Sequence, residues 1–395
     1  MRYGVPYQGS KNKICKWVID NLPSRNVLVD LFAGGCSVTH AAMLSGKWDY
    51  FIANDIGDAP EVFINAIEGK YAAENRWISR EDFERLKDTD PYVSLCWSFG
   101  NDRSNYLYAR EVEPWKKALH YARVFGDTSL LREMGIDSDG STTDVRKHHD
   151  EYKDKYIRWW LSRQKYTPAE LDELMANVKA DIERDKEELR QYLIDALKKS
   201  GLTQAEVQRR LGTQMAGHYF GRSQWKFPTQ EMYEKMQEFM PLKTDYNEIV
   251  GLYRLRQSLQ SLQRLQGLEN LQRLQSLQRL ENYKNLIVTQ KYYTELVIPD
   301  GAIVYADPPY KGTDIKGYIC RFDYEQFERW LGAVPFMVIV SEYTAPAGCV
   351  EIASIKKQCL RSPTNTGGTT TEKLFVQERF LKQYNEMREQ QRIEI

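Results

Sequence analysis

Apolar segments of the kind that form buried strands lie near both ends of this chain, and a long charged stretch separates them. The N-terminal segments are residues 26–30 and 50–54, and residues 36–45 between them have the pattern of a connecting helix. The C-terminal segments are residues 302–306, 335–340 and 374–376. Strands that are joined through a helix run parallel. We therefore predict an α/β fold whose single sheet is assembled from both ends of the chain, with the middle inserted.

The inserted middle has mostly helical patterns. Residues 167–170, Thr-Pro-Ala-Glu, combine an N-cap, a proline at the first helical position and a glutamate that completes a capping box. Apolar residues then follow at helical spacing, which predicts a long amphipathic helix. A second capping box begins at Thr203, and Gly212 is suited to end that helix. Residues 194–240 are therefore predicted to fold as helix, short turn and helix, followed by more helix.

A leucine occupies every third position from Leu259 to Leu280. Three residues of α-helix turn by about 300°, so the leucines drift around the helix and no single apolar face results. A 3₁₀ helix would align them, but 3₁₀ runs are usually only about three or four residues long. We predict helix of some kind that serves as a spacer or packing arm. A coiled-coil seam is disfavoured because it needs a repeat of about 3.5 residues.

The charge of the chain is balanced, with 55 Lys and Arg against 55 Asp and Glu. This balance argues against a protein that coats nucleic acid indiscriminately but permits a locally basic face. The six cysteines form no CxxC pair and the five histidines form no HExxH motif, so no metal site is predicted. No apolar run reaches the roughly 18 residues needed to cross a bilayer, and a signal peptide's apolar stretch is absent from the start. We expect a soluble, cytoplasmic protein.

A glycine pair follows the first predicted strand. Gly34 and Gly35 open the connecting helix, where glycines let the backbone approach a ligand closely. Asp55 ends the next strand, where a carboxylate can accept hydrogen bonds from ribose hydroxyls. Neither G-x-G-x-x-G nor G-x-x-x-x-G-K-[ST] is present, so a nucleoside site is favoured over a phosphate cradle. The alternative is a tight turn with an incidental aspartate.

The tetrapeptide Asp307-Pro308-Pro309-Tyr310 follows a C-terminal strand. Open α/β sheets bind ligands at the carboxyl ends of their strands. Two consecutive prolines remove two N–H donors and stiffen the turn. Such a turn can accept hydrogen bonds from an amino group while Tyr310 offers a flat face for stacking. The alternative is a structural turn without chemistry, which the glycine segment in the same chain disfavours.

With these segments in this order, the chain resembles the Dam-type (D12 class) DNA adenine-N6 methyltransferases, which use S-adenosylmethionine. The matching pieces are residues 6–11, 30–39, 54–56 and 307–310, with a looser match at residues 98–108. The resemblance covers residues 1–125 and 285–380, whereas the inserted helices and the leucine triplets depart from better-known members. It implies a Rossmann-like methyltransferase sheet with an inserted, mainly helical target-recognition region.

The resemblance also implies a role for each matching residue. A pocket for S-adenosylmethionine would be lined by Tyr7, Lys11, Phe32, Ala33, Gly34 and Gly35, with Asp55 on the ribose and Asp30 near the methionine end. Asp307 and the Pro308 carbonyl would hold the 6-amino group of adenine. Tyr310 would stack on that base after it has been flipped out of the duplex. By the same analogy, an Asp before Pro-Pro-Tyr favours adenine over cytosine.

Cationic and amide side chains surround the predicted helix-turn-helix, in which residues 213–220 are the candidate recognition helix. Arg and Gln suit base edges in the major groove, and Lys suits phosphates. The predicted contacts with double-stranded DNA are Arg209, Arg210, Arg222, Gln224 and Lys226. The alternative is a helical bundle with solvated charges, in which Trp225, Phe227 and Tyr233 form the core.

These patterns favour a site-specific DNA adenine-N6 methyltransferase. The alternatives are cytosine-N4 methylation and a DNA-binding regulator with a degenerate methyltransferase core; an RNA or protein substrate is less favoured. A solitary modification enzyme and one paired with a restriction endonuclease are both compatible with the chain. The predicted domains are residues 1–125 with 285–385 for catalysis, 126–247 for DNA recognition and 248–284 for the leucine triplets.

Overall fold

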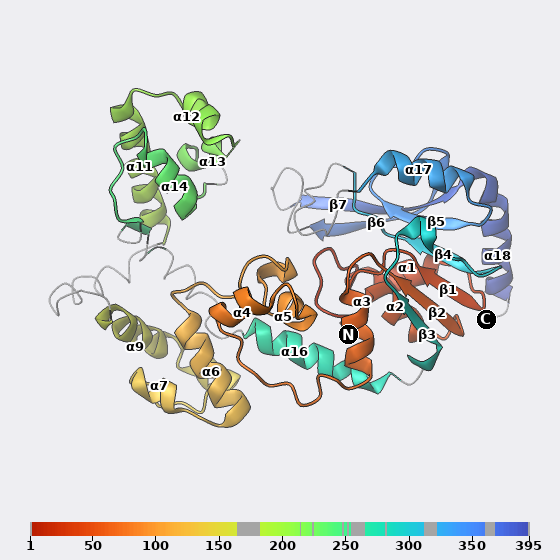
Figure 1. Cartoon of the computed structure of the whole chain (residues 1–395), viewed down its shortest axis with the longest axis horizontal. Helices are drawn as coiled ribbons and strands as arrows, with labels where there is room; N and C mark the ends of the chain where they lie inside the picture. The colour runs from red at the N-terminus through yellow and green to blue at the C-terminus, as the bar shows by residue number, and fades with distance from the viewer. Residues whose placement is uncertain are drawn as a thin grey trace. The chain divides into compact units, whose positions relative to one another are not determined.

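The computed structural model describes residues 2–163, 182–213, 215–222, 225–246, 249–250, 253, 265–280, 283–311, 322–359 and 368–393. The chain divides into two compact units, which are described separately below (Figure 1). One unit combines Met1–Leu107 with Gln266–Ile395, and the other is Tyr108–Leu265. No helix among the described residues is long and apolar enough to cross a membrane.

The first unit is built on a seven-stranded sheet whose order is β3-β2-β1-β4-β5-β7-β6 (Figure 1). The strands are β1 Val27–Asp30, β2 Tyr50–Asn54, β3 Leu286–Thr289, β4 Ile303–Ala306, β5 Val338–Glu342, β6 Cys349–Cys359 and β7 Gly368–Gln377. Strands β1 to β5 pair in parallel, while β7 runs antiparallel to both β5 and β6. The prediction of an α/β sheet assembled from both ends of the chain is therefore confirmed.

Strand β4 pairs directly with β1 although 272 residues lie between Asp30 and Ile303 in the sequence. Val29 lies opposite Val304, and the amide of Leu31 donates to the carbonyl of Tyr305 at 2.8 Å. From β1 the chain continues to β2 on one side of the sheet, and from β4 it continues to β5 on the other side. The strand order therefore reverses between β1 and β4. In open α/β sheets, ligands bind at the carboxyl ends of the strands at this point.

Short helices accompany this sheet: α1 Cys15–Asn21, α2 Ser37–Met43, α3 Ala59–Ile67, α4 Arg80–Leu86, α5 Pro91–Cys96, α16 Gln266–Ser276, α17 Tyr324–Ala333 and α18 Leu381–Ile393. One core cluster packs the strands β1, β4 and β5 against α17, with Val29, Val304, Val338 and Leu331 fully buried. The predicted connecting helix 36–45 is α2, and the predicted strand 374–376 is the inner part of the longer β7.

Residues 364–373, which are rich in Thr and Gly, would be expected to form a loop, and for residues 368–373 this expectation is wrong. They form the first half of β7, where Thr369, Thr370 and Thr371 pair with β6. β-branched side chains fit a pleated surface well, so threonine favours a strand once a partner strand is available. Residues 364–367 lie outside the described residues.

The leucine triplets from Leu268 onward belong to this unit. They form α16, followed by a 3₁₀ turn at Leu277–Arg279. Leu271, Leu274 and Leu277 are buried, and the change to 3₁₀ winding brings the last of them back to the buried side. The helical prediction is confirmed for this part of the repeat, whereas residues 254–264 lie outside the described residues.

The second unit is helical. Its described helices are α6 Glu113–Phe125, α7 Ser129–Glu133, α8 Thr142–Lys147, α9 His149–Ser162, α11 Ile182–Ser200, α12 Gln204–Leu211, α13 Ala216–Phe220 and α14 Gln230–Gln237. The capping box at Thr203 and Glu206 forms, and Gly212 ends α12 with a φ of +63°. The other predicted capping box, at residues 167–170, lies outside the described residues.

The candidate recognition helix is shorter than predicted. Residues 213–220 were expected to be helical, but α13 spans five residues, and Ala216, Tyr219 and Phe220 on it are buried. They join a core cluster with residues of α11, α12 and α14. Gly212 and Thr213 form the turn instead, and Gln214 lies outside the described residues.

Candidate active site

The carboxyl ends of the three central strands meet at one edge of the sheet. Asp30 is the last residue of β1, Asn54 is the last residue of β2, and Asp307 directly follows β4. The buried Asn54 side chain joins the ends of β1 and β2 to the residues after β3, because its Nδ2 donates to the carbonyl of Leu31 at 3.2 Å and to that of Lys291 at 3.0 Å. The end of β4 lies beside that of β1 because the two strands pair. The segments that were predicted separately from the two ends of the chain therefore face a common site.

The glycine loop, residues 33–36, packs backbone to backbone against residues 4–7. The amide of Val5 donates to the carbonyl of Gly35 at 2.8 Å. A Cβ atom at Gly35 would lie 2.5 Å from Cβ of Tyr7, and one at Gly34 would lie 2.7 Å from Cε1 of the same tyrosine. Gly34 also has a φ of +47°, which a residue with a side chain rarely adopts. Glycine is thus required at both positions so that Tyr7 can cover the loop.

Asp55 is fixed by backbone amides. Its Oδ2 accepts from the amide of Gly34 at 2.8 Å, and its Oδ1 accepts from the amide of Gly57 at 2.8 Å. Burial raises the pKa of this carboxyl, while the two amides act in the opposite direction. A carboxylate oxygen can accept more than one hydrogen bond. Each oxygen therefore retains capacity for a hydroxyl group, as the predicted contact with a ribose requires.

Asp30 is almost completely buried beneath the same loop. Its Oδ2 accepts from the hydroxyl of Thr39 at 2.7 Å and from the amide of Thr39 at 3.2 Å. Burial raises the pKa of Asp30 to about 7, because these hydrogen bonds only partly compensate for the lost hydration. A cation placed near Asp30 would be stabilised and would lower this pKa.

The other two predicted pocket residues take part in the packing of the loop. Phe32 belongs to an aromatic cluster in which its ring centroid lies 5.4 Å from that of Tyr293 and 5.8 Å from that of Phe327. The amide of Ala33 donates to the carbonyl of Asn54 at 2.8 Å. These contacts hold the loop on the sheet, and a contact of either residue with a cofactor stays a prediction.

Lys11 reaches the tetrapeptide. Its Nζ lies 2.6 Å from Oδ2 of Asp307 and 3.9 Å from Oε1 of Glu372. The other oxygen of Asp307, Oδ1, is buried and has no hydrogen-bond partner among the residues that the structure describes. Burial raises the pKa of Asp307, and the Lys11 ammonium opposes this rise. The Asp307 carboxylate is thus stabilised at Oδ2 by the Lys11 ammonium, and its Oδ1 can accept a hydrogen bond from a ligand.

Tyr310 is held by several neighbours. Its hydroxyl donates to Glu372 and lies 3.1 Å from the hydroxyl of Ser341, which donates to the same carboxylate at 2.7 Å. Its carbonyl accepts from the hydroxyl of Tyr324 at 2.6 Å, and its ring meets that of Tyr343 edge to face at 4.6 Å. Only 8% of Tyr310 is exposed. The ammonium of Lys11 lies over the Tyr310 ring, 4.6 Å from its centroid, so a stacking role for this ring stays a prediction.

Three polar residues of this site were not predicted from the sequence. Ser341 and Glu342 end β5, and Glu372 lies in the first half of β7. All three are buried, and Glu372 has no exposed surface. A carboxylate inside an apolar strand, as in residues 338–342, is the one sequence signal that could have pointed to Glu342. Glu372 gave no such signal, because its position depends on the pairing of β7 with β5.

The charges at this edge are mainly negative. Burial raises the pKa of Glu342 to about 7, as it does for Asp30. Together with Asp307 and Glu372 these groups place four carboxyls near the strand ends, and Lys11 is the one described cation paired with any of them. Such a site favours a ligand that carries positive charge and hydrogen-bond donors. No cluster of His, Cys, Asp and Glu suited to a metal ion occurs in the part of the chain that the structure describes.

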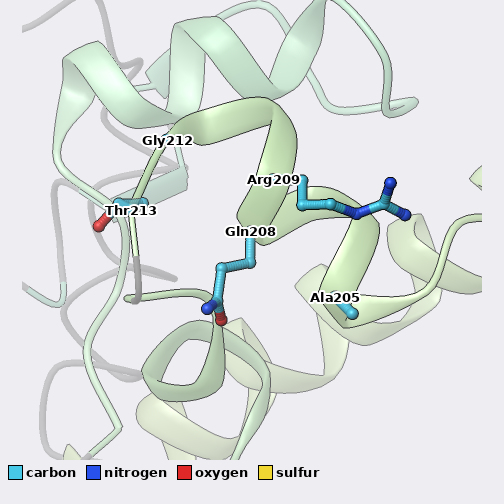
Figure 2. Close-up of a pocket in the computed structure, with 5 residues that line it drawn as sticks. All are labelled: Ala205, Gln208, Arg209, Gly212 and Thr213. Atoms are coloured by element: carbon cyan, nitrogen blue, oxygen red, sulfur yellow. The ribbon is translucent and has the colours of Figure 1, made fainter.

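The predicted DNA contacts lie in the second unit. Arg209, Arg210, Arg222 and Lys226 are exposed, whereas Gln224 lies outside the described residues. Arg209 lines an open pocket along one face of α12 together with Ala205, Gln208, Gly212 and Thr213 (Figure 2). Figure 2 shows the polar ends of Gln208 and Arg209 directed away from the helix.

The aromatic residues of this region belong to its core. Trp225 and Tyr233 are buried and pack with Phe227, and Trp225 Nε1 donates to the carbonyl of Tyr219 at 2.9 Å. The exposed Arg209, Arg210, Arg222 and Lys226 therefore lie on the surface of a packed helical core.

Comparison with protein families gives a match over the N-terminal third of the chain. Residues 7–132 match the family model of the D12 class N6 adenine-specific DNA methyltransferases. No curated protein matches the chain. The matched residues include Tyr7, Lys11, the glycine loop and Asp55, whereas Asp307 lies beyond them and joins this site through the pairing of β4 with β1.

Proposed function

We propose that this chain is an N6 adenine-specific DNA methyltransferase that takes the methyl group from S-adenosylmethionine, and the match of residues 7–132 to the D12 class supports the proposal. The observation that carries the proposal is the buried Oδ1 of Asp307, which has no hydrogen-bond partner among the described residues and lies at the switch point of the sheet beside the glycine loop. A buried acceptor of this kind is costly unless a ligand supplies a donor. The 6-amino group of adenine is such a donor.

The chemistry of the amino group explains why an acceptor is needed. The lone pair of this nitrogen is delocalised into the purine ring, so the nitrogen is a weak nucleophile. When Asp307 and the Pro308 carbonyl accept hydrogen bonds from its two N–H groups, the nitrogen moves toward tetrahedral geometry and its lone pair becomes available. Lys11, 2.6 Å from Asp307, favours the ionised carboxylate and so keeps it an acceptor. Positioning and electrostatics then supply the catalysis without a covalent enzyme intermediate.

The residues around the glycine loop fit a cationic nucleoside cofactor. Asp55 has acceptor capacity for ribose hydroxyls, and Asp30 would be stabilised by a nearby positive charge. Tyr7 and the loop backbone, which meet without intervening side chains, would form the walls of the pocket. S-adenosylmethionine, when bound there, supplies a methyl group activated by its sulfonium. Tyr7, Gly34 and Gly35 would position the cofactor, and Lys11 would stabilise the ionised carboxylate of Asp307.

We propose that the second unit recognises double-stranded DNA through the exposed cations around α12. Arg209, Arg210, Arg222 and Lys226 support this assignment, because they are exposed on a packed helical core that includes a capped helix and a glycine turn. Arginines of this kind contact base edges or phosphates. Recognition of a base sequence by these side chains would make the reaction site-specific. The target adenine would then have to be flipped out of the duplex to reach Asp307.

The test is methylation of plasmid DNA that carries no methylated bases. The full-length protein is incubated with plasmid and S-adenosylmethionine, and the digested nucleosides are analysed by mass spectrometry, with Asp307→Ala as the control. N6-methyladenine that forms only with the wild type would support the substrate, the donor and the role of Asp307 together. Formation of 4-methylcytosine, or of no methylated base while S-adenosylmethionine binds, would overturn the proposal.

A further inference from the structure

Helix α16, which contains the described leucine triplets, carries polar residues that bind backbone carbonyls elsewhere in the same unit. Asn270 Nδ2 donates to the carbonyl of Cys96 at 2.7 Å. Gln275 Nε2 lies 3.2 Å from each of three carbonyl oxygens in the segment 71–74. Arg273 donates through Nε to the carbonyl of Gly4 at 2.8 Å and through Nη2 to the carbonyl of Tyr3. The triplets therefore place leucines in the core and donors between them.

The segment that Arg273 binds is the one that covers the glycine loop. Gly4 has a φ of +66°, and a Cβ atom there would overlap the backbone of residues 35–37. The next residue, Val5, donates its amide to the carbonyl of Gly35 at 2.8 Å. Two residues further, the ring of Tyr7 lies against Gly34 and Gly35. Residues 3–7 thus lie between Arg273 on one side and the loop on the other.

His40 of helix α2 holds the same segment from a second direction. Its Nδ1 accepts the amide of Gly4 at 2.9 Å, and its ring packs edge to face on Tyr3. Burial lowers the pKa of His40 to about 4, so the ring is neutral and can accept this hydrogen bond at neutral pH. The backbone of Gly4 is therefore bonded at its amide and at its carbonyl.

From these contacts we infer that Arg273 is a positioning residue of the cofactor pocket, which it shapes through residues 3–7. The inference rests on the proposed function, and it assigns a role to a part of the chain that departs from the resemblance. Two neighbouring carbonyls suit an arginine, because its planar fork presents several donors in fixed directions. No carboxylate lies within ion-pair distance of Arg273 among the described residues, so its bonds go to the backbone. Burial lowers the pKa of Arg273 to about 10, which leaves it charged at neutral pH.

The experiment compares Arg273→Lys, Arg273→Met and Gln275→Met in the full-length protein. Lysine keeps the charge but offers a single ammonium, and methionine removes every donor at similar length. Gln275→Met is the matched control, because it removes hydrogen bonds from the same helix to a different segment. Two quantities are measured: the affinity for S-adenosylmethionine by calorimetry, and the hydrogen–deuterium exchange of the Val5 amide in the protein without cofactor.

We expect Arg273→Met to weaken the affinity about tenfold, since a pocket wall that is no longer held in place must be ordered when the cofactor binds. Arg273→Lys should have a smaller effect, both variants should speed the exchange of Val5, and Gln275→Met should match the wild type in both measurements. Wild-type affinity and wild-type exchange in the Arg273 variants would overturn the inference. If the wild type binds no S-adenosylmethionine, the proposed function fails, and the exchange of Val5 still decides whether Arg273 holds the segment. If Arg273→Met does not fold, the affinity and the Val5 exchange of Arg273→Lys test the inference.

Discussion

Asp30 shows that a residue suited to a ligand can destabilise the free protein. Because burial raises its pKa to about 7, the folded protein keeps a proton that the unfolded chain releases between about pH 4 and 7. The free energy of unfolding therefore falls as the pH rises through this window, by at most about 4 kcal/mol from this group. A cationic cofactor would stabilise the same carboxylate. The Asp30 charge therefore lowers the stability of the free protein and favours binding of the cofactor.

We expect Asp30→Asn to be more stable than the wild type at pH 8 by about 1–2 kcal/mol, and to lose most of this advantage at pH 5. The asparagine oxygen can still accept the hydrogen bonds from Thr39. Urea unfolding at the two pH values measures the difference, with Asp20→Asn on the exposed face of α1 as the control. A difference that does not depend on pH would show that burial of the Asp30 charge does not limit stability.

Glu372 is expected to set the pH dependence of the reaction. Burial raises the pKa of Asp307, Lys11 lowers it, and the nearby Glu372 raises it again. In Glu372→Gln the last contribution disappears, so the pKa of Asp307 falls and the acidic limb of the pH–rate profile moves to lower pH. The measurement is kcat/KM between pH 5 and 9. Glu351→Gln is the control, because Glu351 lies on neighbouring β6 and pairs with the partly exposed Lys373 at 2.9 Å. A limb that moves to higher pH in Glu372→Gln would contradict this role.

At the scale of elements, the turn from β1 to α2 cannot accommodate a side chain at Gly34 without a shift of Tyr7. Gly34→Ala places a methyl group against the Tyr7 ring and strains a positive φ. Gly46→Ala has the same kind of strain, since its φ is +70°, but nothing lies within 4 Å of the added Cβ. Both variants should lose about 1 kcal/mol of stability from backbone strain. Only Gly34→Ala should also lose affinity for S-adenosylmethionine, by at least about tenfold, as measured by calorimetry. Equal affinities in the two variants would argue against Tyr7 as a wall of the pocket.

The elements that the sequence predicted share one property. Strands β1, β2 and β4 are compact apolar runs in the sheet's centre, and a run of this kind is recognisable without knowing its partners. Strand β3, at one edge, is an apolar run of the same kind and was not predicted. The hairpin of β6 and β7 lies toward the other edge, and polar residues interrupt the patterns of both of its strands. Their strand character depends on pairing with distant segments, which composition does not encode. Glu372 was missed for the same reason.

At the scale of the whole molecule, the order of motifs along the chain predicted which ends would meet. The glycine loop and the tetrapeptide lie on strands that pair, and this pairing is confirmed by the sheet. The ion pair between Lys11 and Asp307 was not predicted, since Lys11 was expected in the cofactor pocket on the basis of the resemblance alone. Contacts between side chains from different elements depend on register and rotamers, which motif order does not specify.

The division into two units predicts that DNA binding and cofactor binding can be changed independently. The side chain of Arg222 is 82% exposed, and its nearest carboxylate, in Glu187, lies 3.7 Å away. Arg222→Ala should weaken DNA binding about tenfold at low salt and reduce the slope of log Kd against log salt by about 1, because one contact with the nucleic acid is lost. Affinity for S-adenosylmethionine should not change, because the glycine loop and Asp307 belong to the other unit.

Arg329→Ala on α17 of the first unit is the matched control for Arg222→Ala. Its side chain is 70% exposed, and its carboxylate partner, Glu325, lies 3.8 Å away, so the two substitutions remove similar surface ion pairs. Such pairs contribute little to stability, which limits indirect effects in both variants. Fluorescence anisotropy with a labelled duplex, measured at several salt concentrations, separates the outcomes. If both variants lose affinity equally, the effect is one of net charge, and the specific role of the α12 region in DNA recognition is contradicted.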